Sequence, residues 1–79
     1  MAIALEQAKS LTWHDMLYHV RYRNADGTPV RCRVNGAVKT WTRSPQKVQV
    51  PWKHGMHEYG YLTESDLDDF CLTEEEALT

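Results

Sequence analysis

The chain has few of the residues that would indicate a membrane span or a disulfide framework. Its 79 residues contain no apolar run near the roughly 18 residues that a transmembrane helix needs. Cys32 and Cys71 are too few for a disulfide framework, and their apolar-alternating surroundings are typical of small buried side chains. The N-terminal stretch lacks a basic leader, so we expect no secretory signal and a cytoplasmic location.

Signals for catalysis and for cofactor binding are equally scarce. Neither cysteine stands in a recognisable catalytic context. The sequence has no glycine-rich phosphate loop and no EF-hand pattern. His54 and His57 lack the additional Cys or His pair that would complete a zinc site. We therefore expect a protein that is not an enzyme and that carries no metal or cofactor.

Charge is distributed unevenly, although the formal net charge is only −2. Residues 19–54 carry eight basic side chains and one acidic side chain, a net charge of +7. Residues 55–79 carry eight acidic side chains and no Lys or Arg, a net charge of −8. The chain is thus a basic body with an acidic C-terminal third.

Apolar and polar residues alternate with a period of two over much of the chain, which predicts half-buried strands. The pattern places Met16, Tyr18, Val20 and Tyr22 on the inward side of one strand. It also buries alternate residues of two further strands, over residues 30–34 and 48–52. Asp26-Gly27 and Asn35-Gly36 predict tight hairpin turns, since both pairs tolerate positive φ. Pro51 predicts an edge strand or a bulge.

These signals predict an all-β fold with a minor α segment, specifically a small SH3-like five-stranded antiparallel barrel. The SH3-like step is an analogy at the level of the fold. We expect residues 1–79 to form a single domain. Within it, residues 1–12 form a helical or frayed N-terminal segment, residues 13–72 the barrel and residues 73–79 an acidic tail.

The same alternation predicts a basic outward face. Trp41 falls in phase with Lys39 and Arg43, and cations beside an aromatic ring are typical of single-strand binders. Trp and Arg are also frequent hot spots of protein interfaces. Alternatively, the cations only keep strand edges soluble, or the acidic tail covers them. The predicted partner-binding residues are Arg21, Arg23, Arg31, Arg33, Lys39, Trp41, Arg43 and Lys47.

The acidic segment has two interpretations. A dense carboxylate array on a small protein imitates a phosphate backbone and can occupy the nucleic-acid groove of another protein. The array is also typical of an ordinary solvated chain terminus. The carboxylates concerned lie in residues 64–69 and 74–76.

The middle of the chain resembles a group of short uncharacterised proteins of tailed phages and prophages. The resemblance spans roughly residues 17–63 and leaves out the acidic ending. It implies a phage or mobile-element origin, and the group supplies no established activity. The motifs that carry it are Tyr18-His19, Asn24-Ala25-Asp26-Gly27-Thr28-Pro29-Val30-Arg31, Arg33-Val34-Asn35-Gly36, Lys39-Thr40-Trp41, Pro51, Lys53-His54-Gly55 and Tyr61-Leu62-Thr63.

Three functions remain open on these grounds. The first is a phage-type binding protein that occupies and inhibits a host nucleic-acid-handling complex, as anti-CRISPR inhibitors do. The second is a small β-barrel that binds nucleic acid directly, and the third is a phage structural or assembly component. The expected partner is a host protein or nucleoprotein complex, or else DNA or RNA bound by the basic face. We expect no binding to a membrane.

Overall fold

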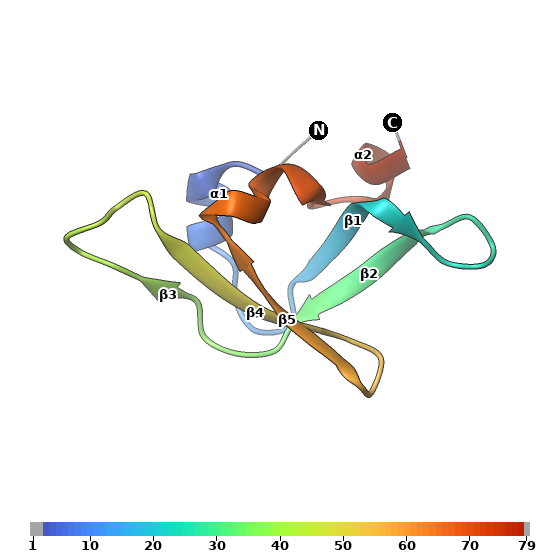
Figure 1. The fold of residues 1–79 in the computed structure, drawn as a ribbon, viewed down its shortest axis with the longest axis horizontal. Coiled ribbons are helices and arrows are strands. Elements are labelled where there is room, and N and C mark those ends of the chain that lie inside the picture. Colours follow the sequence, from blue (N-terminus) through green and yellow to red (C-terminus); the bar gives the residue numbers. More distant parts are fainter. Residues whose placement is uncertain (1–2, 79) are drawn as a thin grey trace.

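In the computed structural model, which describes residues 3–78, six strands form one antiparallel sheet (Figure 1). Two short α-helices and one 3₁₀ turn accompany the strands. The elements in chain order are α1 (Leu5–Lys9), β1 (Met16–Arg23), β2 (Pro29–Val34), β3 (Lys39–Thr40), β4 (Val48–His54), β5 (Glu58–Thr63), the 3₁₀ turn η1 (Glu64–Asp69), β6 (Phe70–Cys71) and α2 (Glu74–Leu78).

The sheet runs in the order β3-β4-β2-β1-β6, and β5 pairs with β4. The expected mostly β, antiparallel class is therefore confirmed. The sheet has six strands where five were expected, and within residues 3–78 it is not closed into a barrel. No helix in this part of the chain is long and apolar enough to cross a membrane.

The phase expected for β1 is wrong in its first half. Leu17 is fully buried opposite Cys32, whereas Met16 is exposed and Val20 is only half-buried. The register of β1 against β2 shifts between Tyr18 and Arg23, so a single alternation does not hold along the strand. Met16 and Tyr18 consequently share the outward face.

The two predicted turns have different outcomes. The Asp26-Gly27 turn is confirmed, since the Asn24 N–H donates to the Thr28 carbonyl over 2.8 Å and Gly27 has a φ of 88°. No hairpin forms at Asn35-Gly36, because the Asn35 N–H donates to the Pro51 carbonyl and β2 continues beside β4. A Cβ on Gly36 would lie 3.0 Å from Pro51 Cγ, so the glycine there permits a close approach of the segment after β2 to β4.

The core lies between the inner face of the sheet and α1. Fully buried side chains on β1, β2, β4 and β5 meet there, and Ile3, Ala8 and Leu11 cover them from the N-terminal side. Both cysteines are buried. The fully buried side chains include Leu17, Cys32, Val34, Val48, Val50 and Leu62.

The acidic C-terminal third is folded onto the sheet. In η1, the Thr63 N–H and hydroxyl both donate to Asp66 Oδ2 over 3.1 Å. In α2, Ala77 is buried and its carbonyl accepts a hydrogen bond from Arg23 Nη2 over 2.8 Å. Figure 1 shows the two coils, orange and red, on the same side of the sheet.

Candidate functional site

The structure distributes the eight predicted contact residues over three separate places. One pair lies against the C-terminal elements, a second pair lies on β2, and four lie at the β3–β4 connection. Figure 1 shows that connection and the β1–β2 loop at opposite ends of the long axis. The three groups are Arg21 with Arg23, then Arg31 with Arg33, then Lys39, Trp41, Arg43 and Lys47.

Arg21 and Arg23 make contacts within the chain. Arg21 Nε lies 3.0 Å from Asp69 Oδ1 of η1. Arg23 Nη1 donates to the carbonyls of His19 and Val20 over 3.2 and 3.1 Å, in addition to the bond with Ala77. Both guanidinium groups therefore attach the acidic C-terminal third to β1.

Trp41 is half-buried beneath two lysines. Lys39 Nζ and Lys47 Nζ lie 5.1 and 5.9 Å from the centre of its ring, within the range of cation–π attraction. Lys47 also faces Glu64, whose pKa is lowered mainly by backbone hydrogen bonds and further by this ammonium group. Two ammonium groups therefore lie within cation–π range of the half-buried Trp41 ring.

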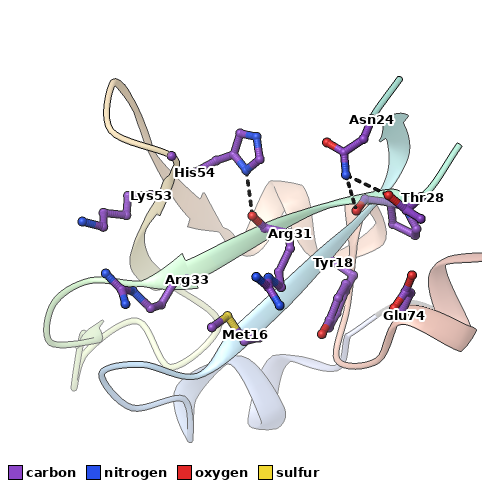
Figure 2. Close-up of a pocket in the computed structure, with 11 residues that line it drawn as sticks. Met16, Tyr18, Asn24, Thr28, Arg31, Arg33, Lys53, His54 and Glu74 are labelled. Carbon is purple, nitrogen blue, oxygen red and sulfur yellow. Dashed lines mark hydrogen bonds between the residues drawn. The ribbon is translucent and has the colours of Figure 1, made fainter. Parts of the chain in front are cut away.

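Arg31 and Arg33 line a hollow of about 570 Å³ on the outward side of the sheet (Figure 2). Lys53 of β4 joins them, and Met16 and Tyr18 of β1 lie across from the two arginines. Lys53 belongs to the site although the predicted site residues omitted it. The sequence signal for Lys53 was its position in the period-two pattern, which directs its side chain away from the core.

The strand register explains why these side chains meet. Arg33 pairs with Met16 on one side and with Lys53 on the other, and Arg31 pairs with Tyr18. Side chains directly opposite each other on one face of a sheet lie about 5 Å apart at Cβ. The hollow is therefore built from two adjoining rows across three strands.

The three cations of the hollow have no anionic partner. Arg31, Arg33 and Lys53 form neither an ion pair nor a side-chain hydrogen bond within residues 3–78. Among the residues that line the hollow, Glu74 is the carboxylate, and it lies at the end opposite Lys53 in the view of Figure 2. The hollow thus concentrates positive potential where an incoming anion has access.

Hydrogen bonds hold the two ends of the hollow. His54 Nδ1 lies 2.8 Å from the Arg31 carbonyl, which ties the end of β4 to β2. At the other end, Asn24 Nδ2 donates to Thr28 Oγ1 over 2.9 Å and to the Pro29 carbonyl over 3.3 Å (Figure 2). The outline of the hollow is therefore set by backbone-anchored contacts.

Two exposed tyrosines extend this face beyond the hollow. Tyr59 and Tyr61 of β5 are 64% and 60% exposed. They pair with Lys53 and Pro51, so they lie on the same side of the sheet as the cations. The sequence did not indicate that the face carrying these rings continues into the basic one.

The described residues show no arrangement for metal binding, and Cys32 is not suited to thiol chemistry. Within residues 3–78, no group of three or more His, Cys, Asp or Glu side chains is placed to hold a metal ion. Burial raises the pKa of the Cys32 thiol to about 11, with a further rise from Glu58, so the reactive thiolate is scarce at neutral pH.

Comparison with protein-family models, with curated proteins and with solved structures gives no match for the chain. Its function is therefore inferred from the geometry and charge of its own residues.

Proposed function

We propose that this chain is a non-enzymatic protein that binds nucleic acid through the hollow on the outward face of its sheet. One observation carries the proposal. Arg31, Arg33 and Lys53 line a single hollow beside Tyr18, and none of the three has a partner within the described chain.

A phosphate backbone suits this arrangement chemically. Each guanidinium group presents a planar fork of donors that matches the oxygens of a phosphate, and the lysine adds a compact positive charge. Contacts with phosphates position a nucleic acid, whereas a ring such as that of Tyr18 is suited to bases. Binding would also release the counterions condensed on the nucleic acid.

The finer fold assignment is part of the same proposal. Successive pairings run β6-β1-β2-β4-β5, and η1 is a 3₁₀ turn directly before the last strand. This order and this turn support an SH3-like arrangement in which the sheet curls around its core without closing. The face of the sheet turned away from the core carries the hollow.

The test removes the three charges and keeps the aliphatic stems. In Arg31→Gln/Arg33→Gln/Lys53→Gln, we expect affinity for labelled DNA and RNA to fall and the salt dependence to become shallower. For single strands, the slope of log K against log salt should decrease in magnitude by about 2, since each phosphate contact contributes about 0.7. Fluorescence anisotropy across a salt series measures both quantities.

The matched control is Lys39→Gln/Arg43→Gln/Lys47→Gln, which removes the same charge from exposed positions outside the hollow. An equal loss of affinity in the control would show that only net charge matters. Absence of nucleic-acid binding by the unaltered protein at low salt would refute the proposal.

A second candidate is inhibition of a host nucleic-acid-handling complex by a protein of phage origin. The observation that favours it is that the two acidic elements, η1 and α2, lie on the same side of the sheet (Figure 1). Such an array would compete with a phosphate backbone for a basic groove on the target. The test is target-DNA binding by purified bacterial RNA-guided nucleases with and without the protein. Inhibition should be lost in Asp68→Asn/Glu75→Gln, and no inhibition of any complex would remove this candidate.

A further inference from the structure

We infer that the nucleic acid bound by this chain is single-stranded and that its bases stack on Tyr59 and Tyr61 of β5. The inference rests on the proposed function and adds the form of the ligand and two residues that contact it. Neither tyrosine belongs to the hollow itself.

The tyrosines and the cations share one continuous face. Lys53 pairs with Arg33 on one side and with Tyr59 on the other. Since neighbouring strands lie about 4.8 Å apart, Tyr59 is about 10 Å from Arg33 across the sheet. A strand whose phosphates contact the hollow therefore has its next bases within reach of β5.

The spacing of the two rings suits separate bases. Tyr59 and Tyr61 are two residues apart on a strand, which places them about 7 Å apart on the same face. Gly60 between them points to the opposite face, where it meets the Trp52 ring. No bulky neighbour on β5 therefore stands between the two rings, and each can take one base.

The rings are held at the surface and do not serve the core. Both are more than half exposed, whereas Val50 and Leu62 on the reverse side of the same strands are fully buried. The Tyr59 hydroxyl donates to the Met56 carbonyl over 3.4 Å, which directs this ring toward the β4–β5 turn. Exposed aromatic residues on a sheet are the usual platform for unpaired bases.

A duplex cannot use these rings in this way. The flat faces of its bases are covered by neighbouring base pairs, so stacking on a sheet needs an unpaired strand. A duplex would contact only the cations of the hollow. The combination of unpartnered cations with two exposed rings therefore favours a single strand over a duplex.

The experiment compares a labelled oligothymidine of roughly 12 nucleotides with a duplex of the same length, using fluorescence anisotropy. We expect the single strand to bind more tightly, and Tyr59→Ala/Tyr61→Ala to weaken its binding by at least about 5-fold, up to about 150-fold for one base. The salt slope should stay unchanged, since no phosphate contact is lost. Tyr59→Phe/Tyr61→Phe keeps the rings and should retain the affinity.

The matched control is Tyr22→Ala, which removes a ring that is 65% exposed and lies tilted against His19. Its affinity should equal that of the unaltered protein, and circular dichroism checks that each variant is folded. If the unaltered protein binds nucleic acid but the Tyr59→Ala/Tyr61→Ala variant binds equally well, the rings do not contact bases and only this inference fails. Equal binding of duplex and single strand would also refute this inference and leave the proposed function standing. If nothing binds, the proposed function fails with it.

Discussion

Arg23 Nη2 donates a hydrogen bond of 2.8 Å to the carbonyl of Ala77, and this bond joins β1 to α2 across 54 positions of sequence. The same guanidinium group donates to two carbonyls of its own strand. Ala77 is buried at the contact. The acidic C-terminal helix is therefore held on the sheet by a basic residue that the sequence placed on a contact surface.

The first prediction concerns this link. Arg23→Ala should lower the free energy of unfolding by about 1–3 kcal/mol, since charged hydrogen bonds to carbonyls are lost. Chemical denaturation measures the loss, and hydrogen exchange should show faster exchange in α2. The control is Arg43→Ala, an exposed position for which we expect a change within about 0.5 kcal/mol. An unchanged exchange rate in α2 would argue against the anchoring role.

The second prediction concerns Gly60 and Trp52. A Cβ at Gly60 would lie 2.4 Å from Cζ2 of the Trp52 ring, closer than any stable contact. Gly60→Ala should therefore lower the free energy of unfolding by about 1–3 kcal/mol, the usual range for overpacking. In the Trp52→Phe background the same substitution should cost less, and a double-mutant cycle measures the difference. Additive effects of the two substitutions would show that the ring is not the cause.

The third prediction concerns His19 and pH. Burial is the main cause that lowers the pKa of His19 below its ordinary 6.5, with Arg21 and Arg23 also lowering it and Asp69 and Asp66 raising it. The ring lies between Tyr22 and Phe70, with centroid distances of 4.3 and 4.8 Å. Below its ordinary pKa the unfolded chain binds the proton more readily than the folded chain, so protonation favours unfolding.

The contribution of His19 is thus present in full above pH 6.5 and is lost as the pH falls through that value toward the lower folded pKa. The measurement is the free energy of unfolding at several pH values, compared with His19→Phe, which keeps an aromatic ring. The variant should lose less stability on acidification. Subtracting its free energy of unfolding from that of the unaltered protein at each pH removes the contributions of the other histidines. A folded-state imidazole pKa above 6.5 by NMR titration would contradict the prediction.

The fourth prediction concerns the carboxylate at the edge of the hollow. Glu74 lines the hollow and opposes an incoming anion. Glu74→Gln should raise the affinity for nucleic acid by about 2- to 5-fold at low salt, the size of a surface charge interaction. The gain should fade at high salt through screening. Glu75→Gln is the control, since Glu75 is a neighbouring exposed glutamate that does not line the hollow.

Local signals in the sequence predicted part of the candidate site. The outward phase of Arg31 and Arg33 follows from the burial of Cys32 and Val34 between and beside them, and the structure has this alternation. The role of Lys53 and of the β5 tyrosines was not predicted. Their place beside β2 depends on which strand pairs with β4, and alternation within one strand carries no information about its neighbours.

The sequence by itself determined the features that depend on a few adjacent residues. These are the mostly β content, the turn at Asp26-Gly27, the burial of both cysteines and the separation of basic from acidic segments. Each follows from dihedral preference, period-two burial or simple composition.

Tertiary structure alone decided the phase of β1, the path at Asn35-Gly36 and the division of the predicted basic face into three places. Asn35-Gly36 tolerates a hairpin, but the bond from Asn35 to Pro51 and the pairing of β2 with β4 prevail. The physical reason is that pairing and register maximise burial and hydrogen bonding over the whole sheet, so distant residues outweigh a favourable local turn.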